Sequence, residues 1–347
     1  MKYCDLYFEE LKTACEDLDL RDLENKKILI TGGSGLILSA LVDILCYANS
    51  KCGTHISIFL AARTEQEIST RFTEYYGQPF LHYVNYDALK PVDLPVNADY
   101  IIHGASNAHP AAYATEPVET LMANVSGLKN LLDYAVHVDS KRLLYISSSE
   151  VYGRKDEARP FNEDDYGFVD ILNPRACYPS GKRASETLCV AYTQEYNVET
   201  VIVRPGHIYG PTANPYDTRA TAQFARDVLA GNDIVMKSAG DQLRSYCYMT
   251  DCATAILTVL LKGKSTEAYN ISNRDSVVSI RQIAEEMAKA AGCKVVFESA
   301  TDSEKKSYNM MDNSSLNAEK LESLGWTARY SVAEGVRRTI EIMKEDV

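Results

Sequence analysis

The stretch "KKILITGGSGLILSALVDIL", residues 26–45, decides the fold. It predicts a buried strand, a glycine turn and a helix, the βα unit whose helix N-terminus binds phosphate. Glycines lie at Gly32, Gly33 and Gly35, but Leu38 stands where the dinucleotide fingerprint has its last glycine. That glycine lets the helix pack closely on the strand, so Leu38 is expected to push the helix outward or rotate it without removing the phosphate donors. On this loop alone, a βα unit that has lost its ligand remains the alternative.

Segments of strand and helix character alternate from this unit to residue 210. The order predicts an α/β fold with a Rossmann-type doubly wound parallel sheet in a dinucleotide-binding domain, residues 26–210. Residues 1–25 are predicted to be a helical extension. Residues 211–347 are predicted to form mainly a smaller C-terminal α/β lobe that binds the substrate. Besides the opening unit, strands are expected at 55–63, 80–88, 98–106, 141–153 and 198–210, and helices at 64–76, 116–138 and 178–196.

The alternation weakens in the C-terminal lobe. Residues 213–241 are expected to form a loop, a helix and a short hairpin. Ser279 and Gln282 have the spacing of a capping box at the start of a helix over 279–292. Because ligands of open α/β sheets lie beyond the carboxyl ends of the strands, we expect this lobe to cover the reactive end of the cofactor.

Composition limits the classes of function. The net charge is −12 and no basic patch is visible, which argues against a nucleic-acid partner. The chain has no apolar run long enough to cross a membrane, and its acidic, amphipathic start is not a signal peptide. None of the nine cysteines forms a C-x-x-C pair, so no zinc or other metal site is predicted. We interpret them as reduced thiols of a cytoplasmic protein.

The end of the second strand bears on the choice of dinucleotide. An NAD site usually has an acidic residue there to bind the ribose hydroxyls, but this chain has Arg63. An arginine suits the 2′-phosphate of NADP, whereas a solvated surface arginine is the structural alternative. Asp87, after the third strand, is the candidate adenine contact.

Tyr178 and Lys182, in "YPSGK", are the candidate proton-transfer pair. Residues four apart share one face of a helix, and a neighbouring lysine is expected to lower the pKa of a tyrosine from about 10. A phenolate can take the proton of a sugar hydroxyl while hydride leaves the carbon. The spacing alone is common, but here it follows "ISSSEVYG", residues 146–153, which supplies hydroxyls and a carboxylate at a strand end.

With these motifs the chain resembles the extended short-chain dehydrogenase/reductases, the NAD-dependent epimerase/dehydratase family that acts on nucleotide sugars. The resemblance runs from Lys26 to Val347. The segment "NPRACYPSGKRASET", 173–187, and the Ser-Glu pair before "VYG" are especially similar to UDP-glucuronate decarboxylases. Other matching segments are "HGAS" (103–106), "RPGHIYGP" (204–211), "RSYCYMTD" (244–251), "YNISN" (269–273) and "LGW" (324–326).

The resemblance implies the family's first step. Tyr178, held by Lys182, deprotonates the sugar 4-hydroxyl, Ser148 hydrogen-bonds the same oxygen, and hydride passes from C4 to NAD or NADP to give a 4-keto sugar. The family favours NAD, whereas Arg63 favours NADP. Implied cofactor contacts are Gly32, Gly33, Ser34, Gly35, Leu36, Ile37, Arg63, Asp87, Ala88, Gly104, Ala105, Ser106, Asn124, Tyr178, Lys182 and Arg204; implied substrate contacts are Asn107, His109, His207, Arg219 and Arg244.

The second step divides the family. A 4,6-dehydratase uses Asp-Glu, but this chain has Ser149 and Glu150, and a serine is too weak an acid to protonate the leaving 6-hydroxyl. A decarboxylase needs no such acid, because a 4-keto uronic acid is a β-keto acid. Its family pattern combines Ser-Glu with an arginine, matched by Arg244. Decarboxylation is therefore favoured, with 4-epimerisation as the alternative and dehydration less favoured.

Departures from the family pattern leave the sugar open. His207 replaces the usual asparagine near the diphosphate, and Thr212 stands where decarboxylases have an arginine, with Arg219 nearby as a substitute. Residues 106–113 replace a proline-rich substrate loop. A non-catalytic dinucleotide sensor or scaffold is the alternative of another class, although such a protein does not need the proton-transfer residues. The family also implies a homodimer formed through the helices near 116–137 and 178–196.

Overall fold

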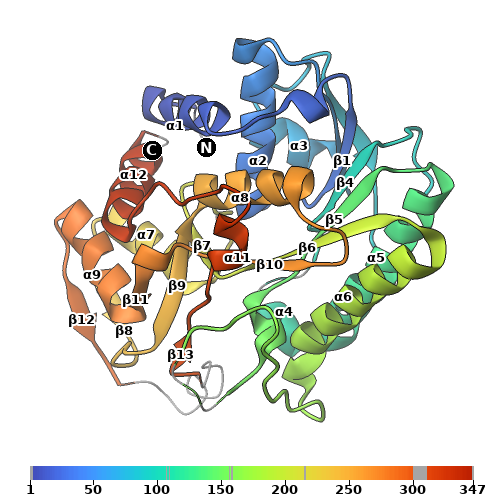
Figure 1. Ribbon diagram of the computed structural model, residues 1–347. Coiled ribbons are helices and arrows are strands. Elements are labelled where there is room, and N and C mark those ends of the chain that lie inside the picture. Colours follow the sequence, from blue (N-terminus) through green and yellow to red (C-terminus); the bar gives the residue numbers. More distant parts are fainter. Residues whose placement is uncertain are drawn as a thin grey trace.

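A seven-stranded parallel sheet forms the centre of the molecule (Figure 1). The computed structural model describes residues 3–106, 108, 110–155, 157, 159–214, 216–299 and 311–345. The strand order β10-β6-β5-β4-β1-β2-β3 confirms the predicted doubly wound sheet. The strands are β1 (Lys27–Thr31), β2 (Ser57–Ala62), β3 (Leu81–Asn85), β4 (Tyr100–His103), β5 (Arg142–Ile146), β6 (Glu199–Pro205) and β10 (Ala268–Ile271).

Helices cover both faces of this sheet. Along β1, Ile28 and Ile30 pack into one buried cluster and Leu29 into another, because successive side chains of a strand point to opposite faces. The first cluster includes α2 (Leu36–Tyr47) and α8 (Met249–Lys262), and the second includes α5 (Pro117–His137) and α6 (Cys177–Tyr196). Both faces are therefore dry, as continuous apolar strands of a parallel sheet require.

An N-terminal helix, α1 (Asp5–Glu16), packs against α2. The hydroxyls of Tyr3 and Tyr7 donate to the buried carboxylate of Asp43 on α2 at 2.6 and 2.7 Å. Arg71 makes an ion pair with the same carboxylate at 2.6 Å, so the buried charge is compensated. Figure 1 shows α1 beside the last helix, α12 (Val332–Lys344).

The part after residue 210 contributes to two structures. β10 and α8 return to the large sheet, while short strands form separate small sheets. The predicted hairpin in 213–241 is wrong, because Ile234–Met236 pairs in parallel with the distant strand Val295–Phe297 rather than with a neighbour in sequence. The predicted capping box of Ser279 and Gln282 is confirmed. Whether the domain boundary lies at residue 210 stays a prediction.

The remaining elements are short or belong to this C-terminal part. They are α3 (Glu65–Arg71), α4 (Pro110–Thr115), η1 (Arg21–Leu23), η2 (Ala48–Cys52), η3 (Ser149–Tyr152), η4 (Pro174–Ala176), η5 (Arg274–Ser276), β7 (His207–Tyr209), α7 (Ala220–Leu229), β8 (Ile234–Met236), β9 (Leu243–Tyr248), β11 (Val277–Ser279), α9 (Ile280–Ala291), β12 (Val295–Phe297), β13 (Asn313–Ser314) and α11 (Glu319–Glu322).

Candidate active site

The glycine turn between β1 and α2 has the shape that a dinucleotide phosphate site needs. Gly32 has φ +74°, and a Cβ there would lie 2.8 Å from the backbone of Gly104 and Ala105, so only glycine fits. Gly35 is the N-cap of α2 and donates its N–H to the Gly32 carbonyl at 3.1 Å. The turn, with Gly33, Ser34, Leu36 and Ile37, thus presents a helix N-terminus without an intervening side chain at Gly32, which fits a pyrophosphate.

Leu38, the departure from the fingerprint, is buried against β4's end. Only 3% of it is exposed, and its Cδ1 lies 2.4 Å from the position that a Cβ on Gly104 would take. The first turn of α2 is held on another side by Thr212, whose hydroxyl donates to the Leu36 carbonyl at 2.7 Å. Leu38 is thus accommodated by the absence of a side chain at Gly104.

The other predicted cofactor residues lie at the carboxyl ends of β2, β3 and β4. Arg63 follows β2 with its side chain exposed, and Asp87 follows β3 and accepts the N–H of Leu89 at 3.1 Å. Ser106 donates to Asn124 of α5 at 3.1 Å. Ala88 lies where a Cβ on Gly127 of α5 would meet it at 3.2 Å, and Asn107 and His109 lie outside the described residues.

The predicted proton-transfer residues converge beyond the end of β5. Tyr178 and Lys182 are both buried on α6, with 6% and 3% exposure. The Lys182 ammonium donates to the Ile146 carbonyl at 2.7 Å and lies 5.6 Å from the centroid of the Tyr178 ring. The hydroxyls of Ser148 and Tyr113 hydrogen-bond to Tyr178. The structure therefore brings together the predicted trio and adds Tyr113.

The electrostatics of Tyr178 differ from the prediction. Burial raises the pKa of Tyr178 to about 12, and the nearby charge of Glu150 also raises it, while hydrogen bonds from Ser148 and Tyr113 and the charge of Arg219 lower it. Lys182 does not contribute to this lowering, and burial lowers the pKa of Lys182 itself to about 7. The predicted lysine-driven phenolate is thus wrong for the free protein, in which burial outweighs the groups that lower the pKa of Tyr178.

Tyr113 and Arg175 are site residues that sequence reasoning missed. The ring of Tyr113 stacks on Tyr178, with centroids 4.6 Å apart and an interplanar angle of 19°. Arg175 lies over the Tyr113 ring at 5.6 Å and makes two hydrogen bonds to Glu150, at 2.9 and 3.0 Å. Tyr113 therefore contacts the trio directly, and Arg175 contacts Tyr113 and Glu150; these contacts join the residues across long distances in the sequence. Ser149 begins η3 next to this ion pair.

Three predicted substrate residues, Arg219, His207 and Arg244, influence one another through their charges. Arg219 is close enough for its charge to lower the pKa of Tyr178, and its own guanidinium is held by Asp217 at 3.0 Å. Burial, then the charges of Arg244 and Arg219, lower the pKa of His207 to about 3, so the imidazole is neutral. Its Nδ1 is buried without a hydrogen-bond partner among the described residues. Arg219 therefore lies near both Tyr178 and His207, whereas Arg244 lies near His207 and is buried, with its guanidinium donating to the carbonyls of Leu243 and Met311 at 2.8 and 2.9 Å.

Arg204 was predicted to bind the cofactor, and the structure assigns it elsewhere. Its Nε and Nη2 bind the carboxylate of Glu186 at 3.0 and 2.6 Å, and Nη1 donates to the Tyr152 hydroxyl and the Glu163 carbonyl. Glu186 also accepts from Ser147 at 2.5 Å. Every guanidinium nitrogen is thus used to join β6, α6 and η3, and we correct its role to a structural one.

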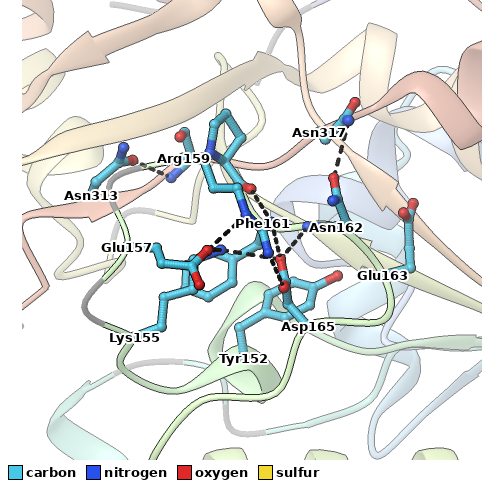
Figure 2. A network of polar contacts seen from close by, with 12 residues as sticks. Tyr152, Lys155, Glu157, Arg159, Phe161, Asn162, Glu163, Asp165, Asn313 and Asn317 are labelled. Carbon is cyan, nitrogen blue, oxygen red and sulfur yellow. Dashed lines mark hydrogen bonds and ion pairs between the residues drawn. The ribbon is translucent and has the colours of Figure 1, made fainter.

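The segment that follows η3 is fixed by a second network, shown in Figure 2. Asp165 accepts from Arg159 twice at 2.7 Å, from Lys155 at 3.2 Å and from the N–H of Asn162 at 2.8 Å. Asn317, from the C-terminal part, donates to the side chain of Asn162 at 3.1 Å. This network ties the segment after the predicted catalytic serine to the C-terminal lobe.

Comparisons with known proteins agree with this fold. The family model described as "NAD dependent epimerase/dehydratase family" matches residues 28–272. The UDP-glucuronic acid decarboxylase 6 of Arabidopsis thaliana is 30% identical over 325 residues, covering 93% of this chain and 89% of that protein. The UDP-glucuronic acid decarboxylase 1 of Xenopus tropicalis is 29% identical over 331 residues, covering 94% of this chain and 74% of that protein.

Solved structures with the same fold include a UDP-glucose 4-epimerase from Thermotoga maritima with UDP-glucose. It has a TM-score of 0.77 and 21% identity, and the match covers 92% of this chain and 99% of that one. A dTDP-glucose 4,6-dehydratase from Bacillus anthracis in complex with NAD has a TM-score of 0.74 and 20% identity, covering 92% and 97%.

The fold and the glycine turn define a dinucleotide-binding α/β protein. More narrowly, the chain belongs to the NAD dependent epimerase/dehydratase family and is an enzyme of that family. Within the residues that the structure describes, no helix is both long and apolar enough to span a membrane.

Proposed function

We propose that this enzyme oxidises C4 of a UDP-uronic acid and then decarboxylates the 4-keto sugar. The observation that carries the proposal is the cluster in which Ser148 and Tyr113 hydrogen-bond to Tyr178 beside the Glu150–Arg175 ion pair. The relatives named UDP-glucuronic acid decarboxylase support the choice of reaction.

Tyr178 is proposed as the base for the 4-hydroxyl, with Ser148 as a hydrogen-bond partner of the same oxygen. Bound NAD or NADP would supply the hydride acceptor at C4, held by the Gly32–Gly35 turn and Lys182. The positive charge of an oxidised nicotinamide favours a nearby phenolate, so the high pKa of Tyr178 in the free protein is expected to fall when the cofactor binds. Lys182, fixed by the Ile146 carbonyl, keeps its amino group beside the tyrosine ring.

The environment of Glu150 supports decarboxylation over dehydration. The bidentate contact with Arg175 orients both carboxylate oxygens, so Glu150 is held by a cation rather than left free to move protons. Its neighbour Ser149 is a hydroxyl and a poor acid. Loss of CO2 from a β-keto acid needs neither an added acid at C6 nor a base at C5, which matches what this site offers.

Arginines are proposed to hold the anionic parts of the substrate. A uronic acid linked to a diphosphate carries charges at both ends. Arg219 lies close enough to act on Tyr178 and His207, and Arg244 lies close enough to act on His207. We propose that they bind the diphosphate and the carboxylate, with the neutral His207 as a further polar contact. Asn107 and His109 remain proposed substrate residues on sequence grounds.

The finer cofactor choice and the assembly are also proposals. Arg63 is exposed at the end of β2, which suits a 2′-phosphate, while the family description favours NAD. We propose a homodimer through α5 and α6, which carry exposed apolar side chains at Val118, Met122 and Val190. A monomeric mass by light scattering at micromolar concentration would contradict it. The nine free cysteines support a reducing, cytoplasmic setting.

Mass spectrometry after incubation with UDP-glucuronate and NAD⁺ or NADP⁺ tests the reaction. Loss of the mass of CO2 is expected where the hydride returns to C4, and loss of CO2 plus two hydrogens is expected where the dinucleotide is released reduced. Loss of the mass of water means dehydration, and an unchanged mass with a new NMR pattern means 4-epimerisation; either result refutes decarboxylation. If no nucleotide sugar in a panel is converted while the dinucleotide still binds, the result favours the sensor alternative.

A further inference from the structure

Leu38 and Gly104 occupy complementary places in the packing around the glycine turn. The turn's Gly32 lies against the backbone of Gly104 and Ala105, where a Cβ on Gly32 would approach within 2.8 Å. On its other side the same Gly104 meets Leu38, whose Cδ1 lies 2.4 Å from an ideal Cβ position. The backbone at Gly104 is thus packed between the phosphate turn and the first turn of α2.

Hydrogen bonds hold the backbone of Gly104 and Ala105 in place. The Gly104 N–H donates to the Thr31 carbonyl at 3.1 Å, and the Ala105 N–H donates to the Thr31 hydroxyl at 3.2 Å. The same hydroxyl hydrogen-bonds to the ring of His103 at 2.7 Å. A side chain added at Gly104 therefore cannot be absorbed by shifting this backbone, and Leu38 or the helix must move instead.

We propose that Leu38 and Gly104 form one coupled positioning pair that replaces the third glycine of the fingerprint. In the usual arrangement a small residue on the helix allows close packing. Here the small residue lies on β4's end, and the leucine of α2 fills the space above it. The pair sets how closely the first turn of α2 packs on the end of β4, and so determines the position of the glycine turn and the dinucleotide affinity. The proposal rests on dinucleotide binding by this family member and not on the proposed decarboxylation.

The proposal predicts that the effect of Gly104→Ala depends on whether Leu38 is present. Gly104→Ala in the wild-type chain places a methyl group against Leu38, and such overpacking is expected to raise the Kd for NAD⁺ about tenfold. Leu38→Ala removes both Leu38 atoms that an added Cβ would meet, leaving Ile146 Cγ1 at 3.4 Å as the nearest contact. In the Leu38→Ala background, Gly104→Ala should therefore change the Kd by no more than about twofold.

The experiment is a double-mutant cycle read by titration with NAD⁺ or NADP⁺, whichever the wild type binds more tightly. Leu41→Ala is the matched control, because Leu41 is a fully buried leucine one turn farther along α2. In the Leu41→Ala background the full tenfold effect of Gly104→Ala should persist. The Kd for UDP, read in parallel, should stay within about twofold in all variants, which a general loss of structure would not allow.

Equal effects of Gly104→Ala in the wild-type and Leu38→Ala backgrounds overturn the proposal, as does a tenfold effect on UDP. If Gly104→Ala alone does not fold, a folded Leu38→Ala/Gly104→Ala variant supports the pair, and a double variant that also fails to fold refutes it. Wild-type protein that binds no dinucleotide removes the premise and the proposal together. A wild type that binds the dinucleotide but does not decarboxylate refutes only the proposed function.

Discussion

The starts of α2 and α6 lie beyond the same edge of one sheet, but they differ in how far their residues depart from the family pattern. At α2 the fingerprint is incomplete, and Leu38 is accommodated because Gly104 across the contact has no side chain. At α6 the residues that bear chemistry keep their family types at Tyr178, Lys182 and Ser148. Packing can exchange a large and a small residue between two neighbouring positions, because swaps that conserve the total volume are tolerated best. A proton-transfer residue cannot be exchanged with a neighbour in this way, because its reacting oxygen must lie at one point in the site.

The largest effect that tests this contrast is expected for Tyr178→Phe. The substitution removes one oxygen and keeps the ring that stacks on Tyr113. Loss of a positioned base should lower kcat at least about 10³-fold, while the Kd for the dinucleotide changes little. Turnover and equilibrium binding are measured on the same preparation. A variant as active as the wild type would refute the role of Tyr178.

Lys182 gives a second, pH-dependent test at α6. Burial lowers the pKa of Lys182 to about 7, below its usual value near 10.4. Between these two pH values the unfolded chain binds a proton that the folded chain lacks, so this residue makes the free energy of unfolding rise with pH by up to about 1.4 kcal/mol per unit. Below about pH 7 its contribution is constant, since both states are protonated.

Lys182→Met should remove that dependence. The free energies of unfolding of the wild type and the variant are measured by denaturant titration between about pH 7 and pH 9. The free energy of unfolding of the variant, relative to that of the wild type, is expected to fall as the pH rises. Parallel curves would mean that Lys182 keeps an ordinary pKa in the folded protein. Lys129→Met is a matched control, because Lys129 lies exposed on α5 in an i,i+4 ion pair.

The sequence predicts those features of each region that depend on residues close together in the chain, and not those that depend on contacts between distant residues. Strand and helix order, the glycine turn and the trio at 148–182 are local or periodic patterns, and these predictions were met by the sheet and by the convergence of the trio. The seating of Leu38 on Gly104, the stacking of Tyr113 and the full use of Arg204 by Glu186 join residues far apart in sequence. The raised pKa of Tyr178 depends on burial, which a helix spacing does not report.

A third test returns to the dinucleotide side, at Arg63. Arg63→Asp removes the cation that suits a 2′-phosphate and places there the acidic side chain that suits ribose hydroxyls. The ratio of the Kd values for NADP and NAD should rise about tenfold, the size of one charge-assisted hydrogen bond. Paired titrations measure the ratio, and an unchanged ratio would identify Arg63 as a surface charge only.

The smallest effect is expected for Leu38→Gly, although this substitution restores the third glycine of the dinucleotide fingerprint. Glycine in this helix leaves the space above Gly104 empty and lowers helix propensity by about 1 kcal/mol, so the dinucleotide Kd should rise by at most about fivefold. Affinity changes but is not created, because Gly32 and Gly35 already form the turn. With the dinucleotide saturating, kcat should stay near the wild-type value, since Tyr178 and Ser148 lie on other elements. A kcat that falls with the affinity would show that the two regions act as one unit, and the contrast between them would be lost.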